Sequence, residues 1–171
     1  MDLETARLRL EPFHDSHYEG LRLMDNDSSV MRYINKGIVK TPEETWESIR
    51  RVQARWDKYG FSWWAIKEKV SGVMVGAACL QHLANVENAP LEIGWRLVPE
   101  QNGKGYATEA AKAIIDFATE QTGATYLVAV ADPENIPSQR VMQRLGMTYK
   151  AKEQYYDVPC VVYELHIPDA D

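Results

Sequence analysis

The feature of this sequence that most constrains its fold is a glycine-rich turn between an apolar strand and a helix. A strand pattern covers residues 91–98, Gly103 and Gly105 follow it, and a helical pattern begins at about Lys104. Two glycines two positions apart let the backbone turn tightly and leave successive N–H groups uncovered. The first four N–H groups of a helix have no internal partner, and the helix dipole favours an anion there. The segment is therefore typical of a loop that holds a phosphate group.

The helix after this turn has a narrow face of small residues. Small and apolar side chains recur at helical spacing at Ala107, Ala110, Ala111, Ile114, Ile115 and Ala118. Alanines at successive contacts let such a helix lie close against a sheet. We expect its N-terminus to lie near the end of the strand that contains Glu92.

Two common phosphate-binding fingerprints do not fit this loop. The dinucleotide pattern GxGxxG lacks its third glycine, because Thr108 stands there. The Walker A pattern would need a glycine at Val98 and a serine or threonine at Gly105. From the loop alone, a phosphate site and an ordinary strand-to-helix turn both stay open.

The rest of the chain predicts a mixed α/β fold. Strand patterns cover residues 5–12, 61–67, 73–80, 126–131, 148–156 and 158–167, and helical patterns cover 14–24, 41–59, 104–122 and 136–145. This order is not the strict βαβ alternation of a doubly wound nucleotide fold. No linker rich in Pro, Gly or Ser divides the sequence, so we expect one domain over residues 1–171.

Composition excludes several classes of function. The formal net charge of −6 argues against a nucleic-acid binder, which needs a basic face. No uncharged apolar run approaches the roughly 20 residues of a membrane span, and the charged N-terminus does not suit a signal peptide. Cys79 and Cys160 are expected to be reduced core thiols, and the location cytoplasmic. His14 and His17 lack the partners of a metal site, so we expect no metal and interpret both as surface residues.

A second polar helix start follows the strand at residues 126–131. Asn135 is a plausible N-cap, and Ser138 stands at the third helical position. Both side chains are expected to lie at the carboxyl end of that strand.

The two helix starts together resemble the motifs of the GNAT superfamily of N-acetyltransferases. The first motif is Gly103-Lys104-Gly105-Tyr106-Ala107, and the second is Asn135-x-x-Ser138 followed by Leu145-Gly146-Met147. Residues 5–13 and 61–66 resemble the branch of ribosomal-protein N-terminal acetyltransferases. The resemblance implies a twisted, mixed, largely antiparallel sheet of about seven strands flanked by about four helices. It also implies that acetyl-CoA lies in a cleft between the splayed fourth and fifth strands.

The resemblance further implies a set of cofactor-binding residues. They are Leu97, Val98, Asn102, Gly103, Lys104, Gly105, Tyr106, Ala107, Thr108, Asn135 and Ser138. The backbone from Gly103 to Thr108 would hold the pyrophosphate, and the strand end at residues 97–98 would pair with the pantetheine arm. Asn102 departs from the family's glutamine or arginine at that position.

The implied reaction is direct attack of a primary amine on the thioester of acetyl-CoA. The amine, on a protein N-terminus or a small molecule, must first lose a proton, because amines titrate near pH 8–10. Glu92 is the candidate general base; alternatively, it is a strand glutamate paired with Arg96 or solvent. Ser138 is the candidate proton donor to the thiolate; alternatively, it and Asn135 only stabilise the helix start.

One further departure leaves a second function open. Many family members have a proton-donating tyrosine where this chain has Met142, which cannot donate. A catalytically weak domain that binds or senses acyl-CoA is therefore the alternative. No nucleic-acid or membrane partner is expected, and a homodimer is the assembly that the resemblance suggests. Trp63 and Trp64 should point to opposite faces of their strand, so that at most one lines the acceptor pocket.

Overall fold

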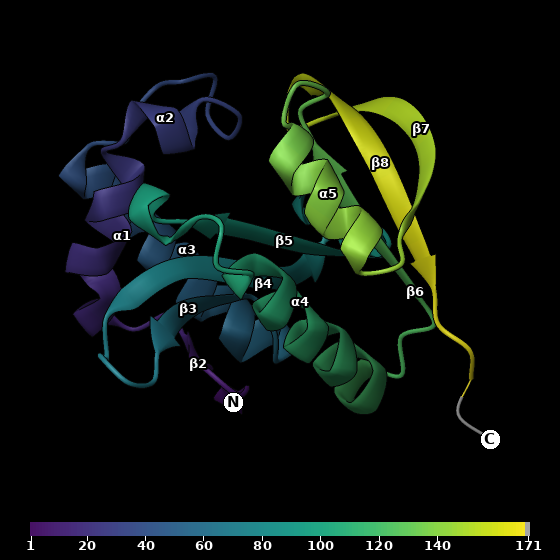
Figure 1. Ribbon diagram of the computed structural model, residues 1–171, viewed down its shortest axis with the longest axis horizontal. Helices are drawn as coiled ribbons and strands as arrows, with labels where there is room; N and C mark the ends of the chain where they lie inside the picture. The colour runs from purple at the N-terminus through teal and green to yellow at the C-terminus, as the bar shows by residue number, and fades with distance from the viewer. Residues whose placement is uncertain (170–171) are drawn as a thin grey trace.

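The structure is a computed structural model and describes residues 1–169. One eight-stranded sheet in the order β1-β2-β3-β4-β5-β6-β8-β7 forms its centre (Figure 1). The strands are β1 (Leu3–Glu4), β2 (Leu8–Pro12), β3 (Trp63–Glu68), β4 (Met74–His82), β5 (Leu91–Leu97), β6 (Tyr126–Ala131), β7 (Thr148–Tyr155) and β8 (Val158–His166). The α-helices in these residues are α1 (Tyr18–Asp25), α2 (Ser28–Met31), α3 (Pro42–Tyr59), α4 (Tyr106–Phe117) and α5 (Ile136–Arg144).

The sheet is largely antiparallel, as predicted. Every neighbouring pair of strands runs antiparallel except β5 and β6, which run parallel. The expectation of about seven strands and about four helices omitted two short elements, β1 and α2. β1 has 2 residues and α2 has 4, which is too short for a hydrophobic period to show in the sequence.

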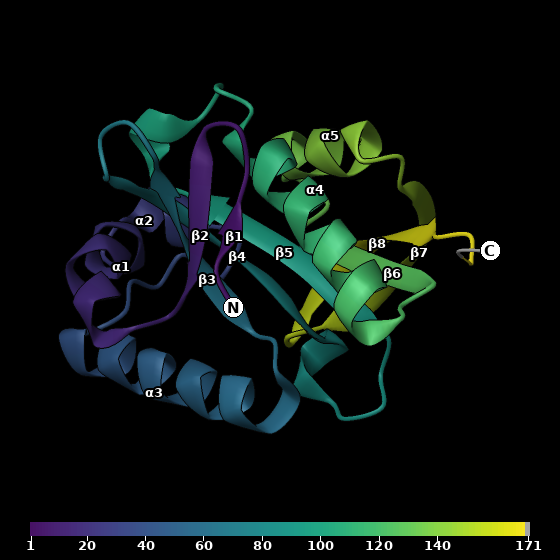
Figure 2. The ribbon, with the colours of Figure 1, turned by 90° about the horizontal axis from the view of Figure 1, so that it is seen from below.

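The helices form two layers on the sheet. Helices α1 and α3 cover one face, and α4 and α5 lie side by side on the other (Figure 2). Trp64 is fully buried in the core beneath α4, whereas Trp63 packs against the core beneath α1 and α3. The two tryptophans therefore point to opposite faces, as their alternation predicts.

The start of α4 differs from its prediction. Gly103 and Gly105 have φ angles of +80° and +79°, which are not helical, so the helix begins at Tyr106 rather than near Lys104. Its small face packs as the spacing predicts: Ala107, Ala110, Ala111, Ile114 and Ala118 are all buried. The last regular turn ends at Phe117, and residues 118–122 continue as a wider π-turn.

The prediction that both His14 and His17 are surface residues is wrong for His17. His17 is 4% exposed, and its Nε2 lies 3.0 Å from Glu11 Oε1. His14 is exposed, and its side chain accepts a hydrogen bond from the Ser16 N–H at the start of a 3₁₀ turn. The contact was missed because Glu11, six residues earlier, was assigned to a half-buried strand and His17 to an amphipathic helix, and neither pattern shows that the two side chains meet.

Three further expectations concern the cysteine thiols, a metal site and membrane-spanning helices. Cys79 and Cys160 are both buried and free, as predicted for core thiols. Within residues 1–169, no group of three His, Cys, Asp or Glu side chains is placed to hold a metal ion. The helices of this part of the chain are too short or too polar to cross a bilayer.

Gly76 on β4 should be intolerant of a side chain. A Cβ at this position would lie 2.3 Å from the Arg96 carbonyl oxygen and 2.8 Å from Leu97 Cδ2, on the neighbouring strand β5. Gly76→Ala should therefore lower the free energy of unfolding by about 1–3 kcal/mol, measured by urea denaturation. In Gly94→Ala the new methyl would meet only Cys79 Sγ at 3.1 Å, so its loss should be smaller. Equal stability of wild type and Gly76→Ala would contradict this close approach of β4 and β5.

Candidate active site

The sheet opens between β5 and β6. These strands pair only at Leu91↔Leu127 and Glu92↔Val128, although β5 continues to Leu97 and β6 to Ala131. On the outer sides, β5 pairs with β4 and β6 pairs with β8 along their whole lengths. The gap is therefore a feature of this one strand pair, and Glu92 lies at the last paired position before the strands part.

The parted strands expose backbone groups. Along β5 beyond Glu92, the edge that faces β6 has no strand partner. An unpaired strand edge can form hydrogen bonds with an extended ligand in the manner of an added strand. This arrangement agrees with the splayed strands that the family resemblance implies.

The predicted pyrophosphate loop lies at the carboxyl end of β5. The backbone N–H groups from Gly103 to Thr108 precede the first intrahelical bond of α4, which the Glu109 N–H donates to the Gly105 carbonyl at 3.0 Å. None of these N–H groups has a protein acceptor within residues 1–169. Gly103, Lys104 and Gly105 are exposed, so the loop presents its free donors to the surface.

The side chains of this loop have different roles from its backbone. Tyr106 is buried, its ring lies beneath the Arg7 guanidinium at 4.6 Å, and its hydroxyl donates to Glu68. Lys104 is exposed, and its ammonium group donates to Gln101 at 2.9 Å. Asn102, at the departure from the family motif, is exposed.

One polar atom beside the loop has no partner. Thr108 Oγ1, in the first turn of α4, is buried and makes no hydrogen bond within the described chain. A buried hydroxyl without a partner is unusual in folded proteins. The free N–H groups and this hydroxyl are all donors, which suits an anionic ligand such as a pyrophosphate.

The second predicted helix start follows β6, the other strand of the parted pair. Asn135 caps α5, and its Oδ1 accepts a hydrogen bond from the Ser138 N–H at 3.3 Å. The amide nitrogen of Asn135 and the hydroxyl of Ser138 make no hydrogen bond to any described residue. Both side chains are half-buried, so capping leaves one donor group on each of them available to a ligand.

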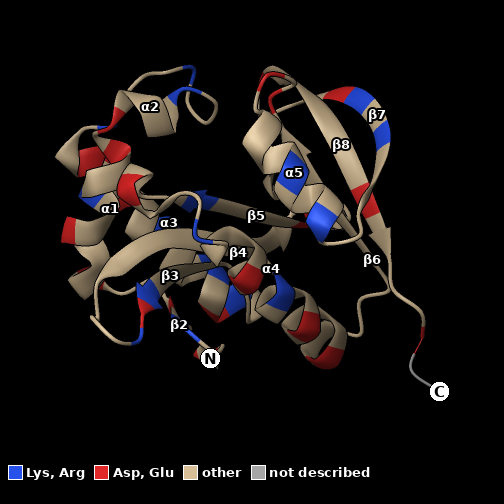
Figure 3. Ribbon diagram, in the orientation of Figure 1, with Lys and Arg blue, Asp and Glu red and all other residues tan. Residues whose placement is uncertain are grey.

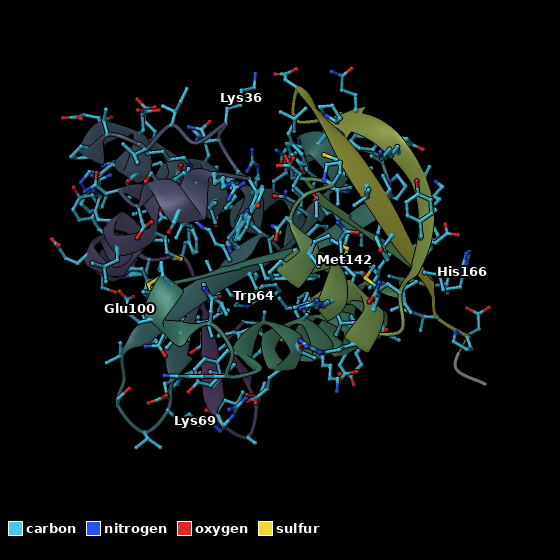
Figure 4. All side chains as sticks on the ribbon, turned by 45° about the horizontal axis from the view of Figure 1, so that its top comes forward. Lys36, Trp64, Lys69, Glu100, Met142 and His166 are labelled. Carbon is cyan, nitrogen blue, oxygen red and sulfur yellow. The ribbon has the colours of Figure 1, made fainter. Side chains whose placement is uncertain are left out.

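Met142 is a core residue. It is 1% exposed and packs with the buried side chains beneath α4 and α5 (Figure 4). The position where many relatives have a proton-donating tyrosine therefore contributes packing here.

Glu92 lies in a buried polar network on the face that α3 covers. It is 5% exposed, and its Oε1 accepts hydrogen bonds from Gln81 Nε2 at 3.2 Å and from the Tyr156 hydroxyl. Gln81 is the cross-strand partner of Glu92 on β4, and its own Oε1 accepts from Trp63 Nε1 at 3.2 Å. The Tyr156 hydroxyl also accepts from the Ala84 N–H at 3.1 Å.

Burial dominates the chemistry of this carboxyl group. Desolvation raises the pKa of Glu92 from 4.5 to about 7, against the opposing effect of the hydrogen bonds from Tyr156 and Gln81. Glu92 also raises the pKa of the Tyr156 phenol, as does burial of that phenol. A carboxylate whose pKa is near neutral can take up and release protons at physiological pH, as a general base must.

Arg96, the alternative partner expected for Glu92, instead forms an ion pair with Asp25. Arg96 Nη1 bonds to Asp25 Oδ1 at 2.7 Å, and Asp25 is 1% exposed. Burial alone would raise the pKa of Asp25, but the Arg96 charge and the hydrogen bonds from Arg96 and Thr45 outweigh it, and the pKa is lowered. This ion pair attaches the end of α1 to β5 and leaves Glu92 to its own network.

Sequence reasoning did not identify Gln81 or Tyr156 as partners of Glu92. Tyr156 and Asp157 both have positive φ and form the tip of the β7–β8 hairpin. The break between the strand patterns of residues 148–156 and 158–167 was the available sign of this tip. Alternation along β4 places Cys79 and Gln81 on one face, but only the strand register places Gln81 opposite Glu92.

Comparison with known proteins identifies relatives over most of the chain. Residues 7–148 match the family model described as an acetyltransferase (GNAT) domain. The uncharacterized protein YkkB of Bacillus subtilis (strain 168) is 31% identical over 163 residues, which cover 95% of this chain and 94% of that protein.

Solved structures share the fold. A GNAT-family acetyltransferase from Bacillus anthracis superposes with a TM-score of 0.82 at 26% identity, over 97% of this chain and 98% of that one. RimL, a ribosomal-protein α-N-acetyltransferase solved in complex with coenzyme A, has a TM-score of 0.80 over 98% of each chain. Its identity is 17%, so this second likeness is one of fold.

Glu92 should make stability depend on pH in a direction opposite to an ordinary carboxylate. Between pH 4.5 and about 7 the unfolded chain ionises Glu92 while the folded protein keeps it protonated, so stability falls as pH rises across this interval. The effect is about 3 kcal/mol by linkage. Glu92→Gln should be as stable as wild type near pH 4.5 and more stable at pH 8, measured by urea denaturation at both values.

The matched control for this experiment is Glu120→Gln, which removes the same charge from an exposed side chain. A wild type that stays as stable as Glu92→Gln at pH 8 would contradict the raised pKa.

Proposed function

The chain belongs to the acetyltransferase (GNAT) family, and we propose that it transfers the acetyl group of acetyl-CoA to a primary amine by direct attack on the thioester. One observation carries the proposal: β5 and β6 part immediately after Glu92, a buried carboxyl group with a near-neutral pKa. The free N–H groups of α4 lie beyond the far end of the same strand. A general base and an anion site are thus joined by one open strand edge.

The residues around the cleft fit acetyl-CoA, which would supply the acetyl thioester. The N–H groups from Gly103 to Thr108 would hold the pyrophosphate, and the free edge of β5 up to Leu97 and Val98 would pair with the pantetheine arm. The charged residues of α5, Arg140 and Arg144, are both basic and exposed although the whole chain carries −6 (Figure 3). A basic helix beside the cleft favours a polyanionic ligand.

Glu92 is proposed as the general base. An amine must lose its proton before it can attack, and a carboxylate near pKa 7 accepts that proton at neutral pH. The hydrogen bonds from Gln81 and Tyr156 hold the carboxylate in one orientation. Because both donors favour the charged form, they keep the pKa from rising further.

Ser138 is proposed as the proton donor to the departing thiolate. Its hydroxyl has no partner in the described chain, and Met142 is buried and has no proton to give. Asn135 is proposed to contact the pantetheine arm through its free amide nitrogen, while its oxygen caps α5.

The second candidate is a catalytically weak domain that binds or senses acyl-CoA. Met142 favours it, since a core methionine stands where many relatives have an acid. The two candidates differ in turnover and share the cofactor.

The same proposal covers the organisation of the protein. Residues 1–171 would form one N-acetyltransferase domain in the cytoplasm, where the free thiols of Cys79 and Cys160 stay reduced. The acceptor would be a protein N-terminus or a small-molecule amine, and the assembly a homodimer. No metal takes part in the proposed chemistry.

Calorimetric titration with acetyl-CoA tests the cofactor, with ATP and NAD as controls. Selective micromolar binding of acetyl-CoA is expected. Its pyrophosphate can use the N–H donors of the loop, and its amide-bearing arm can use the open strand edge, whereas ATP and NAD lack such an arm. Absence of binding by folded protein would overturn both candidates at once.

Substitution of Glu92 then separates the enzyme from the sensor. Glu92→Gln should bind acetyl-CoA with unchanged affinity, and its kcat should be about 10²- to 10⁴-fold lower than that of the wild type. The assay measures release of free thiol from acetyl-CoA over a panel of amines. The wild-type kcat/KM should rise with pH through about 7, and this rise should be lost in the variant. A wild type that binds acetyl-CoA but releases no thiol with any amine would favour the sensor.

Ser138→Ala should lower kcat, measured by the same thiol release, without weakening the binding of acetyl-CoA.

A further inference from the structure

A cavity lies beside the hydrogen-bond network of Glu92, apart from the opening between β5 and β6. It has a volume of about 220 Å³ and lies beneath the C-terminal half of α3, against the segments where β3 begins and β4 ends. Gln81 is part of its wall, and the same side chain donates to Glu92 at 3.2 Å. The cavity and the proposed base are therefore separated by one side chain.

The wall of this cavity is rich in positive charge. None of its nine lining residues is acidic, whereas Arg55 and Lys58 are cationic. Lys58 is exposed and pairs with Glu87 at 3.5 Å. A cavity of this kind is unexpected in a chain of net charge −6, and it favours an anionic ligand.

Arg55 is the charge for which the protein supplies no partner. It is half-buried, and no carboxylate within residues 1–169 lies close enough to form an ion pair with it. Burial lowers the pKa of its guanidinium, and the neighbouring charge of Arg51 lowers it further. Holding a guanidinium away from water without a counter-ion is unfavourable, so an oxyanion bound there would be stabilised by two parallel hydrogen bonds.

Ser62 provides a second, independent observation. It lines the cavity, it is 0% exposed, and its Oγ has no hydrogen-bond partner in the described chain. A serine hydroxyl reorients by rotation about one bond and donates readily to an oxyanion. The cavity thus contains an unpaired cation and an unpaired donor.

Given the proposed acetyl transfer, we propose that this cavity binds an oxyanion group, a carboxylate or a phosphate, on the acceptor whose amine reaches Glu92. Arg55 would hold the anionic group, Ser62 would donate to it, and Gln81 would lie between the two ends of the acceptor. The substrate class is then a primary amine that also carries an acidic group.

The first test is the binding of small oxyanions to the full chain with no amine or acetyl-CoA present. The protein is titrated with acetate and with inorganic phosphate, and the backbone amide NMR signals of Ser62, Gln81 and His82 are recorded. At least one anion should shift these signals saturably. Arg55→Gln should weaken this binding about tenfold or more, because a charged bidentate donor is lost. Absence of saturable shifts, or undiminished binding by Arg55→Gln, overturns the site.

Two further variants sharpen this test. Arg50→Gln removes an exposed charge from the same helix and should leave anion binding nearly unchanged. Ser62→Ala should weaken anion binding without lowering the free energy of unfolding, because the hydroxyl has no internal partner to lose. A loss of stability with unchanged anion binding would show that Ser62 is only structural.

The second test asks whether the anion belongs to the acceptor. Amino acids and their amides, and phosphorylated amines and their unphosphorylated forms, are compared by thiol release from acetyl-CoA. Wild-type kcat/KM should favour the anionic member of a pair, and Arg55→Gln should remove this preference by raising KM with kcat little changed. Acetyl-CoA affinity should be the same in both proteins.

The outcomes separate this proposal from the proposed function. Equal use of both members of every pair, or a preference that survives in Arg55→Gln, overturns the acceptor assignment while acetyl transfer stands. Anion binding without turnover of any amine overturns acetyl transfer and the acceptor assignment together, and leaves a plain anion site.

Discussion

The site depends on one constraint, which is that β5 pairs with β6 at only two positions. Each strand has a complete partner on its other side, β4 for β5 and β8 for β6, so the sheet stays intact although its middle opens. The opening supplies a strand edge for a ligand, and its closed end is where Glu92 lies. Wider pairing would cover the edge that a ligand could use, and no pairing at all would separate the two halves of the sheet.

Several contacts keep the two sides of this opening in place. The small face of α4 lets the helix lie against the sheet, which brings its free N–H groups to the carboxyl end of β5. The buried pair of Asp25 and Arg96 fixes the end of α1 to the same strand. A buried ion pair of this kind adds little net stability but is costly to break, so it favours one arrangement of these elements.

The parts of the fold that could be predicted from the sequence are those that depend on residues close together in the chain. The paired glycines, the alanine face behind them and the Asn135 cap each involve neighbours within a few residues, and the structure has all three. Glu92 was identified as a candidate by its strand, but its burial was not predictable. That burial depends on Gln81 of β4 and on Tyr156 at the tip of the β7–β8 hairpin, and the sequence alone does not show which residues these elements bring to Glu92. His17 was misread although its partner Glu11 is only six residues away, because no periodic pattern joins a strand to the turn that follows it. The elements β1 and α2 were too short to show a period.

The hydrogen bond from Tyr156 to Glu92 joins residues that are far apart along the chain. Tyr156 stands at the tip of the final hairpin, and β8 must insert beside β6 before this tyrosine can reach the carboxyl group. Strands β1 to β5 are neighbours in the sheet, and none of them supplies the phenol partner of Glu92. A polar network centred on β5 is therefore completed by a hairpin from the opposite side of the opening in the sheet.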